Sequence, residues 1–195
     1  MKNPTINLRD LVILIADPQT YTRRIIQGML RAFGANKLME VGHSAVLLET
    51  LAAQKVDVLL LDVGLAPLGG LDLTRAIRRK VDSENRTVPI LLMTSDLRET
   101  TIKDGRDAGA NMIIAKPMSP KDLYDRLAWI AFSPRNFVDT ANYFGPDRRF
   151  KIEGYPNGIG RRKEDREVEI AEESGPTLGQ DDIDSLFAAA RSGSN

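Results

Sequence analysis

Four polar side chains each follow a short apolar run in this sequence, and their types suit one kind of chemistry. They are Asp17 after residues 11–16, Asp62 after residues 56–61, Thr94 after residues 90–93, and Lys116 after residues 112–115. Two neighbouring carboxylates repel each other unless a cation joins them, and their oxygen atoms suit Mg²⁺ where phosphate supplies further ligands. A carboxylate can also attack phosphorus to form an aspartyl phosphate, whose oxygens an ammonium group and a hydroxyl group can bind.

The apolar runs that precede these residues are typical of strands buried on both faces of a sheet. They are short, aliphatic and without sustained polar alternation, and a weaker candidate strand covers residues 37–41. Helical spacing of apolar residues predicts helices around residues 25–33, 44–51, 71–80 and 101–108, and a fifth helix from Pro120 with Ser119 as its N-cap. This alternation predicts an α/β fold with a five-stranded parallel sheet, whose functional site lies at the carboxyl ends of the strands.

The composition excludes several classes of function. The chain has 195 residues, 27 Lys plus Arg against 27 Asp plus Glu, one His and no Cys. A strongly basic nucleic-acid-binding protein, a disulfide framework and a thiolate zinc site are therefore excluded for the chain as a whole. No apolar run approaches the roughly 18 to 20 residues of a membrane span, and the start lacks the apolar core of a signal peptide, so we expect a cytoplasmic protein.

The charges are unevenly distributed along the chain. Residues 1–131 carry 18 basic and 15 acidic side chains, residues 132–166 carry 8 and 5, and residues 167–195 carry 1 and 7. Long apolar runs also stop near residue 132. We therefore predict a folded domain over residues 1–132, a mostly disordered linker over 133–176, and an acidic amphipathic helical peptide over 177–195.

Residues 11–132 resemble the response-regulator receiver family, most closely its single-domain chemotaxis type. The resemblance rests on these pieces, in the family's order and spacing: Ala16-Asp17, the run 59–62 with Gly69-Gly70 downstream, residues 89–95, residues 107–110, and Lys116-Pro117. It implies the flavodoxin-like (βα)5 receiver topology and a role in a two-component phosphorelay, in chemotaxis or motility. It also implies a cis bond between Lys116 and Pro117.

The resemblance assigns roles to the polar residues at the strand ends. Asp62 would accept a phosphoryl group from a histidine kinase, and Thr94 and Lys116 would bind that group. Asp17, Asp62 and the backbone carbonyl of Gly64 would hold Mg²⁺. The protein would be a switch rather than an enzyme, because its only chemistry would be self-catalysed phosphoryl transfer and autodephosphorylation.

The sequence departs from the family pattern in three places. Ala16 stands where the family has a second acid, Ile113 replaces the aromatic switch residue, and the segment 63–67 places its proline one residue late. These departures leave open a receiver-fold scaffold that works without phosphate. A hydrolase acting on an external substrate is disfavoured, because Gly64 stands where a second carboxylate would be needed.

The predicted linker contains two arginine pairs, and it resembles the arginine-bearing tails of some stand-alone receivers. The pairs are Arg148-Arg149 and Arg161-Arg162. Guanidinium groups bind phosphate-bearing anions well, so a cyclic dinucleotide or another anionic partner is conceivable. We favour the simpler account, in which the pairs belong to a solvated basic linker, and keep the anion ligand as the alternative.

The last segment has a helical apolar stripe. Ile183, Leu186, Phe187 and Ala190 fall at i, i+3, i+4 and i+7. The segment is similar to the N-terminal peptide of the flagellar motor switch protein, so we expect it to dock on this receiver or on another protein, such as another receiver or the flagellar motor. No helix-turn-helix pattern follows residue 132, and no DNA-binding output is expected.

Overall fold

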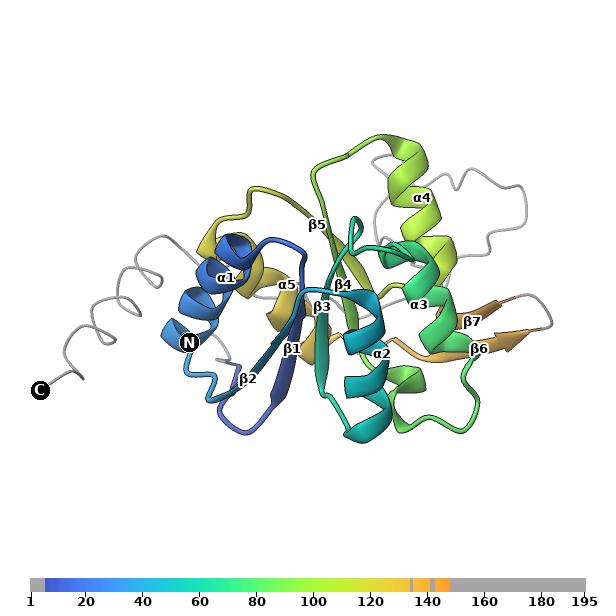
Figure 1. The fold of residues 1–195 in the computed structure, drawn as a ribbon, viewed down its shortest axis with the longest axis horizontal. Helices are drawn as coiled ribbons and strands as arrows, with labels where there is room; N and C mark the ends of the chain where they lie inside the picture. Colours follow the sequence, from blue (N-terminus) through green and yellow to red (C-terminus); the bar gives the residue numbers. More distant parts are fainter. Residues whose placement is uncertain (1–5, 134, 141–142, 148–195) are drawn as a thin grey trace, which may run out of the picture.

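Five short strands form one parallel sheet in the order β2-β1-β3-β4-β5 (Figure 1). They are β1 (Val12–Ala16), β2 (Lys37–Val41), β3 (Val58–Asp62), β4 (Ile90–Thr94) and β5 (Met112–Ala115). The structure is a computed structural model and describes residues 6–133, 135–140 and 143–147. β3 and β4 are buried along their whole length, as expected for strands covered on both faces. The predicted α/β class and the receiver topology are confirmed.

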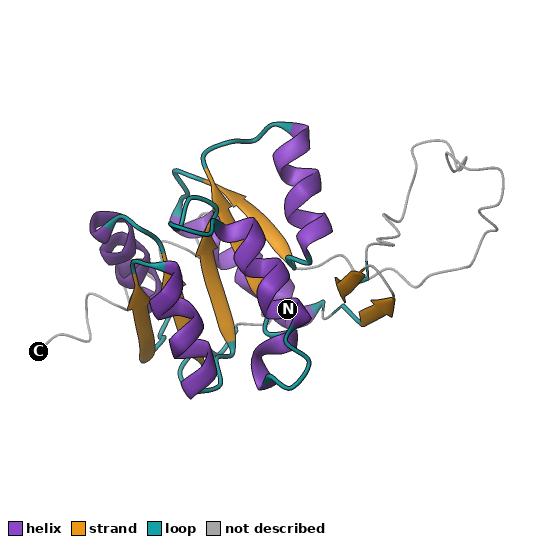
Figure 2. Cartoon of the chain, turned by 45° about the vertical axis from the view of Figure 1, so that its right-hand side comes forward, coloured by secondary structure: helices purple, strands orange, loops and turns teal. Residues whose placement is uncertain are grey.

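Helices cover both faces of this sheet (Figure 2). They are α1 (Thr20–Ala32), α2 (Ser44–Ala53), α3 (Gly70–Arg79), α4 (Glu99–Ala108) and α5 (Pro120–Phe132), with a short 3₁₀ helix η1 (Glu84–Thr87). Ile13 and Ile15 of β1 pack in one core cluster with residues of α1 and α5. Leu14 and Ala16, which alternate with them, pack in the other cluster with residues of α2 and α3. In the described part of the chain, no helix has the length and apolar character needed to cross a membrane.

The start of α5 shows the predicted capping signals. Ser119 Oγ accepts a hydrogen bond from Asp122 N, and the Asp122 carboxylate accepts one from Ser119 N. Ser119 Oγ also donates a hydrogen bond to Asp122 Oδ2, and this bond, together with the one from Ser119 N, holds the pKa of Asp122 below its ordinary value. β5 ends at Ala115 and α5 begins at Pro120, so only four residues connect them. Lys116 is the first of these residues and therefore lies at the carboxyl end of β5.

Residues beyond α5 include an antiparallel hairpin, β6 (Phe137–Thr140) and β7 (Tyr143–Pro146). The hairpin lies within the stretch 133–176 that we predict to be a mostly disordered linker, and the sequence pattern did not predict it. The rings of Phe137 and Phe144 lie 5.4 Å apart, and the Arg86 guanidinium lies 3.4 Å from the centroid of the Phe144 ring. The aromatic residues therefore pack on the domain. The rest of the predicted linker and the peptide 177–195 lie outside the described residues.

Candidate functional site

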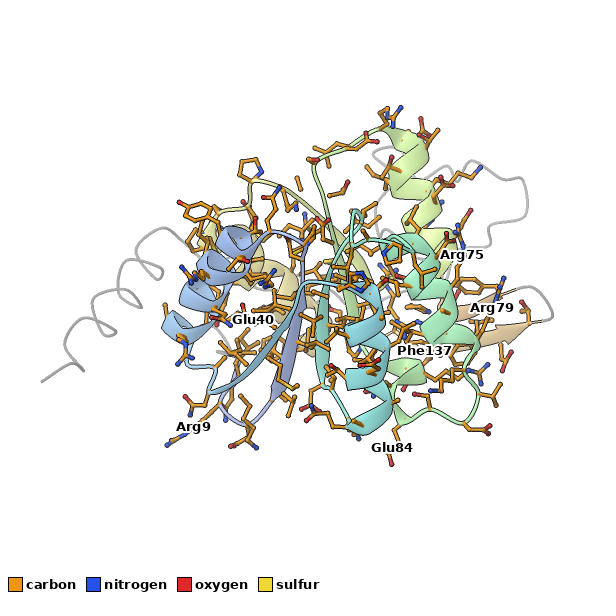
Figure 3. All side chains as sticks on the ribbon, viewed as in Figure 1. Arg9, Glu40, Arg75, Arg79, Glu84 and Phe137 are labelled. Atoms are coloured by element: carbon orange, nitrogen blue, oxygen red, sulfur yellow. The ribbon has the colours of Figure 1, made fainter. Side chains whose placement is uncertain are left out.

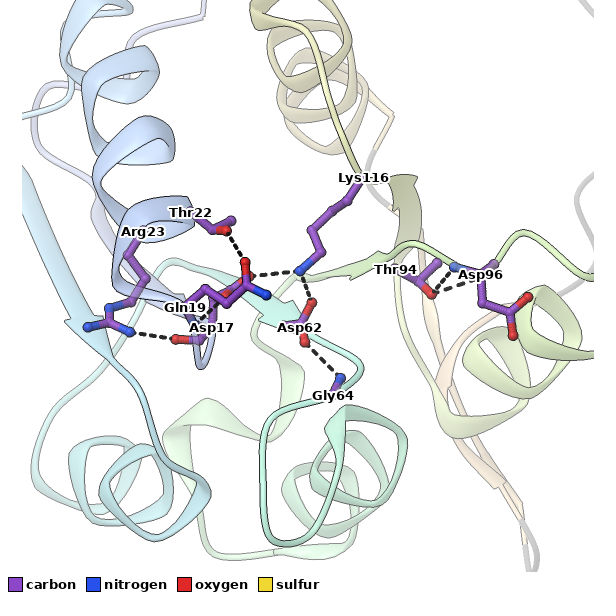
Figure 4. A network of polar contacts seen from close by, with 9 residues as sticks. All are labelled: Asp17, Gln19, Thr22, Arg23, Asp62, Gly64, Thr94, Asp96 and Lys116. Carbon is purple, nitrogen blue, oxygen red and sulfur yellow. Dashed lines mark hydrogen bonds and ion pairs between the residues drawn. The ribbon is translucent and has the colours of Figure 1, made fainter.

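The carboxyl ends of β1, β3 and β5 bring three of the predicted site residues together (Figure 4). Lys116 Nζ lies 3.0 Å from Asp17 Oδ2 and forms an ion pair with Asp62 Oδ2. Asp17 is fully buried and Asp62 is 5% exposed. The Lys116–Pro117 peptide bond is cis, as the resemblance implied. One ammonium group thus bridges two buried carboxylates.

The pKa of Lys116 reflects this position between two acids. Burial lowers it, but the hydrogen bonds to Asp62 and Asp17 raise it by more, so the pKa lies above its ordinary value. Lys116 is therefore fully charged at neutral pH. Its ammonium is the cation that offsets both carboxylates in this structure.

Backbone N–H groups hold the remaining oxygen of each carboxylate. Asp17 Oδ1 accepts a hydrogen bond of 2.8 Å from Gln19 N, and Asp62 Oδ1 accepts one of 2.8 Å from Gly64 N. A Cβ atom at position 64 would lie 3.0 Å from Asp62 Oδ1, so glycine leaves room beside this oxygen. Both carboxylates are thereby fixed with one oxygen directed at Lys116.

The glycine pair at the end of the β3–α3 loop allows α3 to begin close to Asp62. A Cβ atom at Gly70 would lie 2.5 Å from the carbonyl oxygen of Asp62 and 2.8 Å from Val63 Cα. Gly69 has a φ of 79°, which residues with a side chain rarely adopt. The Gly69-Gly70 motif thus serves the backbone geometry of residues 62–70, which connect β3 to α3.

Arg23 of α1 is a site residue that we did not predict from the sequence. Its Nη1 donates a 2.7 Å hydrogen bond to the Asp17 carbonyl oxygen, and its Nε lies 3.3 Å from Glu40 Oε2. A Cβ atom at Gly42 would lie 3.1 Å from Nη1, so glycine there leaves space for the guanidinium. The available signal was helical spacing, since Arg23 precedes the buried Ile26 by three residues.

Thr94 lies at the end of β4 and is 3% exposed, but its hydroxyl faces the loop that follows. Thr94 Oγ1 accepts a 3.0 Å hydrogen bond from Asp96 N and lies 3.3 Å from the Asp96 carbonyl oxygen. Figure 4 shows this pair apart from the cluster of Lys116 and Asp62. The Thr94 hydroxyl is thus held by the β4–α4 loop.

The β4–α4 loop has its own polar network. The Asp96 carboxylate accepts hydrogen bonds from Arg98 Nε and Nη2 and from Thr101 Oγ1. The hydrogen bond from Arg98 is the main reason why the pKa of Asp96 lies far below its ordinary value. The loop that holds Thr94 is therefore itself tied to the first turn of α4.

Ile113, at the position of the aromatic switch residue, packs beneath α4. A Cβ atom at Gly105 would lie 2.8 Å from Ile113 Cδ1 and 3.1 Å from Leu92 Cδ1. The aliphatic side chain and the glycine thus let α4 lie close to the sheet. The switch position is filled here by a partly buried aliphatic residue that packs against the core.

Two carboxylates and a backbone carbonyl are the groups that could hold a metal ion. They belong to Asp17, Asp62 and Gly64. The part of the chain that the structure describes contains no group of three or more His, Cys, Asp or Glu residues that could hold a metal ion. Ala16 is fully buried in the apolar cluster with Leu14 and supplies no side-chain oxygen.

The two carboxylates and the Gly64 carbonyl suit Mg²⁺, which accepts one or two carboxylates together with water and phosphate oxygens. Lys116 contacts both carboxylates, so it would compete with the cation.

We expect Ala16→Asp to raise the affinity for Mg²⁺ by about tenfold or more, because a third carboxylate adds attraction to a divalent cation. Isothermal titration with MgCl₂ measures this. Ala16→Asn, which is similar in size but neutral, is the control and should raise the affinity far less. Equal Mg²⁺ affinity in the wild type and the aspartate variant would contradict the metal assignment.

The seven predicted partner-binding residues cannot be placed in this site. They lie outside the described residues: Arg148, Arg149, Arg161, Arg162, Ile183, Leu186 and Phe187.

Comparisons with known proteins agree with this geometry. The sensory/regulatory protein RpfC of Xanthomonas campestris is 28% identical over 134 residues, which are 69% of this chain and 18% of RpfC, so the chain spans less than a fifth of that relative. The chemotaxis protein CheY of Pseudomonas aeruginosa is 30% identical over 115 residues, 59% of this chain and 91% of CheY. The receiver domain of the sensor histidine kinase PA1611 from P. aeruginosa, solved with a magnesium ion coordinated in its active-site cleft, has a TM-score of 0.56 and 27% identity, covering 63% of this chain and 99% of that one.

Residues 13–128, more than half of the chain, match the response regulator receiver domain family. All four predicted residues at the strand ends lie within this range. The strand order, the bridged carboxylates and the sequence match agree, and the chain belongs to the response regulator receiver family.

Proposed function

We propose that this protein is a cytoplasmic response regulator of a two-component phosphorelay that accepts a phosphoryl group on Asp62 and signals through protein–protein contacts, in chemotaxis or motility. The observation that supports this most is the Lys116 ammonium placed against the Asp62 carboxylate. In the reaction, an Asp62 oxygen attacks the phosphorus of a phosphohistidine in the kinase. The N–P bond breaks, the imidazole leaves, and an acyl phosphate forms.

The described residues supply binding and orientation for this transfer. Gly64 N fixes one Asp62 oxygen, which leaves the other as the attacking atom. Lys116 offers its ammonium to the phosphoryl oxygens. Bound Mg²⁺, held by Asp17, Asp62 and the Gly64 carbonyl, would neutralise negative charge on the phosphoryl group.

Thr94 supplies the switching step of the proposal. Its hydroxyl is bonded to the Asp96 backbone, and an acyl phosphate on Asp62 adds oxygen acceptors at the same edge of the sheet. If the Thr94 hydroxyl turns towards these oxygens, its hydrogen bonds to the Asp96 backbone break. The β4–α4 loop is then no longer held by Thr94. The charge on Asp62 is thereby converted into a movement of the loop.

Phosphorylation of the isolated protein tests the proposal. With acetyl phosphate and Mg²⁺, the wild type should gain the mass of one phosphoryl group, and beryllofluoride should bind it. Asp62→Asn, which keeps the shape but lacks the nucleophilic oxygen, should do neither. Asp57→Asn is the matched control and should be labelled normally. Asp57 precedes the same strand, at the opposite edge of the sheet, where its Oδ2 accepts a hydrogen bond from Val12 N.

A phosphate-independent scaffold is the second candidate. It is favoured by the ion pairs of Lys116, which already offset both carboxylates, and by Ile113, an aliphatic residue at the switch position that packs against the core. Absence of labelling and of beryllofluoride binding in the wild type would favour the scaffold. Labelling that persists in Asp62→Asn would overturn the choice of acceptor.

A further inference from the structure

The β6–β7 hairpin lies outside the residues that match the receiver family, yet its backbone touches the end of α4. A Cβ atom at Gly145 would lie 2.9 Å from Gly109 Cα, and one at Gly109 would lie 3.0 Å from the carbonyl oxygen of Phe144. Gly109 ends α4 with a φ of 99°. Two glycines thus allow the hairpin to contact the C-terminus of α4 directly, without room for a side chain.

Two arginines of the domain contact the two phenylalanine rings of the hairpin. The Arg86 guanidinium lies over the Phe144 ring, and its Nη2 is 3.2 Å from Asp139 Oδ2. The Arg78 guanidinium lies 5.0 Å from the centroid of the Phe137 ring, which Figure 3 places near the C-terminal end of α3. Each hairpin strand therefore places one ring against a cation of the domain, an arrangement typical of a specific docking contact.

The helix α4 connects this contact with the proposed switch. Its first turn follows the loop in which Asp96 holds Thr94, and its last residue precedes Gly109. A helix of ten residues spans about 15 Å and moves as a rigid element. A displacement of the first turn of α4 therefore also moves Gly109. The backbone there is so close to Gly145 that the hairpin cannot keep its position.

We propose that the β6–β7 hairpin is a latch whose docking on the corner formed by α3, η1 and α4 depends on the phosphorylation state of Asp62. The hairpin is docked while Thr94 is bonded to Asp96, and it loosens when Thr94 turns to the acyl phosphate and α4 shifts. This inference rests on the proposed function. Coupling between two sites is reciprocal, so undocking the hairpin must favour the phosphorylated conformation by the same factor.

Hydrogen exchange of the full chain tests the first direction. With beryllofluoride and Mg²⁺, the amides of β6 and β7 should exchange at least about fivefold faster than without them, the lower end of typical allosteric coupling. Asp62→Asn should show no change. If the wild type fails to bind beryllofluoride, the proposed function fails. If it binds and hairpin exchange is unchanged or slower, the latch alone is overturned.

Hairpin variants test the reciprocal direction. Gly145→Val introduces a side chain against Gly109 and against the Tyr143 ring, whose hydroxyl oxygen would lie 2.5 Å from the added Cβ atom. Phe144→Ala leaves Gly145 and Tyr143 unchanged and removes the ring under Arg86. Both variants should undock the hairpin while leaving the five-stranded sheet intact. Each should bind beryllofluoride at least about fivefold more tightly than the wild type. Undocking is verified by the emission of Trp129, the only tryptophan of the chain, whose ring lies 4.6 Å from the Arg135 guanidinium at the base of the hairpin.

Lys103→Gln, on the exposed face of α4, is the matched control and should leave beryllofluoride affinity unchanged. Undocked variants with the affinity of the wild type would overturn the latch. Two chemically different hairpin variants guard against a result that reflects a local folding defect in one of them.

Discussion

Arg78→Met is expected to lower the free energy of unfolding by about 3 kcal/mol or more, because each buried acceptor left without its donor costs about 1 to 3 kcal/mol. Arg78 lies in α3 and is 1% exposed. Its guanidinium donates hydrogen bonds to four acceptors: the carbonyl oxygens of Gly109, Arg86 and Val88 and the side-chain oxygen of Asn111. Methionine fills a similar volume but donates to none of these acceptors.

The size of this effect follows from what Arg78 connects. Its partners lie at the end of α4, in η1, and in the segments before β4 and β5, so one side chain joins four parts of the chain at the amino edge of the sheet. Burial lowers the pKa of Arg78 to about 10, which still leaves it charged at neutral pH. The hydrogen bonds offset the cost of burying that charge, and their loss leaves buried carbonyl groups without donors.

Urea unfolding followed by circular dichroism measures the change. Arg79→Met is the matched control, because Arg79 is the exposed neighbour on the same helix, and it should change the free energy of unfolding by no more than about 0.5 kcal/mol. Arg78→Lys keeps the charge but has a single nitrogen, so its loss should lie between the two. A loss below about 1 kcal/mol in Arg78→Met would contradict this account.

The contrast between Arg78 and the strand-end residues shows what the sequence could predict. Asp17, Asp62 and Lys116 follow apolar runs, and the ends of parallel strands meet at one edge of a sheet, so periodicity alone brings them together. Arg78 follows the same helical pattern but is followed by Arg79 and Lys80. A run of basic residues at a helix end is usually exposed to solvent. Nothing in the local sequence shows that Arg78 is the buried residue of this run.

The hairpin was missed for a related reason. Residues 137–146 lie at the start of a stretch, 133–176, that is rich in glycine, proline and charged residues, a composition typical of a linker. A two-stranded hairpin is also marginal by itself. Its contacts come from Arg78, Arg86 and Gly109, which lie roughly 30 to 60 positions earlier. The orientation of the Thr94 side chain also could not be predicted. The sequence places a hydroxyl group at the end of β4, but only the structure shows that it is hydrogen-bonded to Asp96.

Lys116→Met is expected to destabilise the protein without Mg²⁺ by about 3 kcal/mol or more, because it leaves two buried carboxylates without their cation. Mg²⁺ should restore more stability to this variant than to the wild type. In the wild type a bound metal ion must share Asp17 and Asp62 with the ammonium, and the two cations repel each other. Removing the ammonium should therefore tighten Mg²⁺ binding by about tenfold or more, which corresponds to about 1.4 kcal/mol.

Lys116→Met separates the two roles of the lysine, because the same variant that binds Mg²⁺ more tightly should be phosphorylated more slowly by acetyl phosphate. The ammonium competes with the metal before transfer and binds the phosphoryl oxygens during it. Urea unfolding with and without MgCl₂, calorimetric titration and the rate of labelling measure the three quantities. Lys121→Met is the matched control, since its partly exposed ion pair with Asp125 lies on the outside of α5 and should contribute at most about 1 kcal/mol. Unchanged Mg²⁺ affinity in Lys116→Met would show that the ammonium and the metal ion do not share the carboxylates, and an unchanged labelling rate would show that Lys116 does not bind the phosphoryl group.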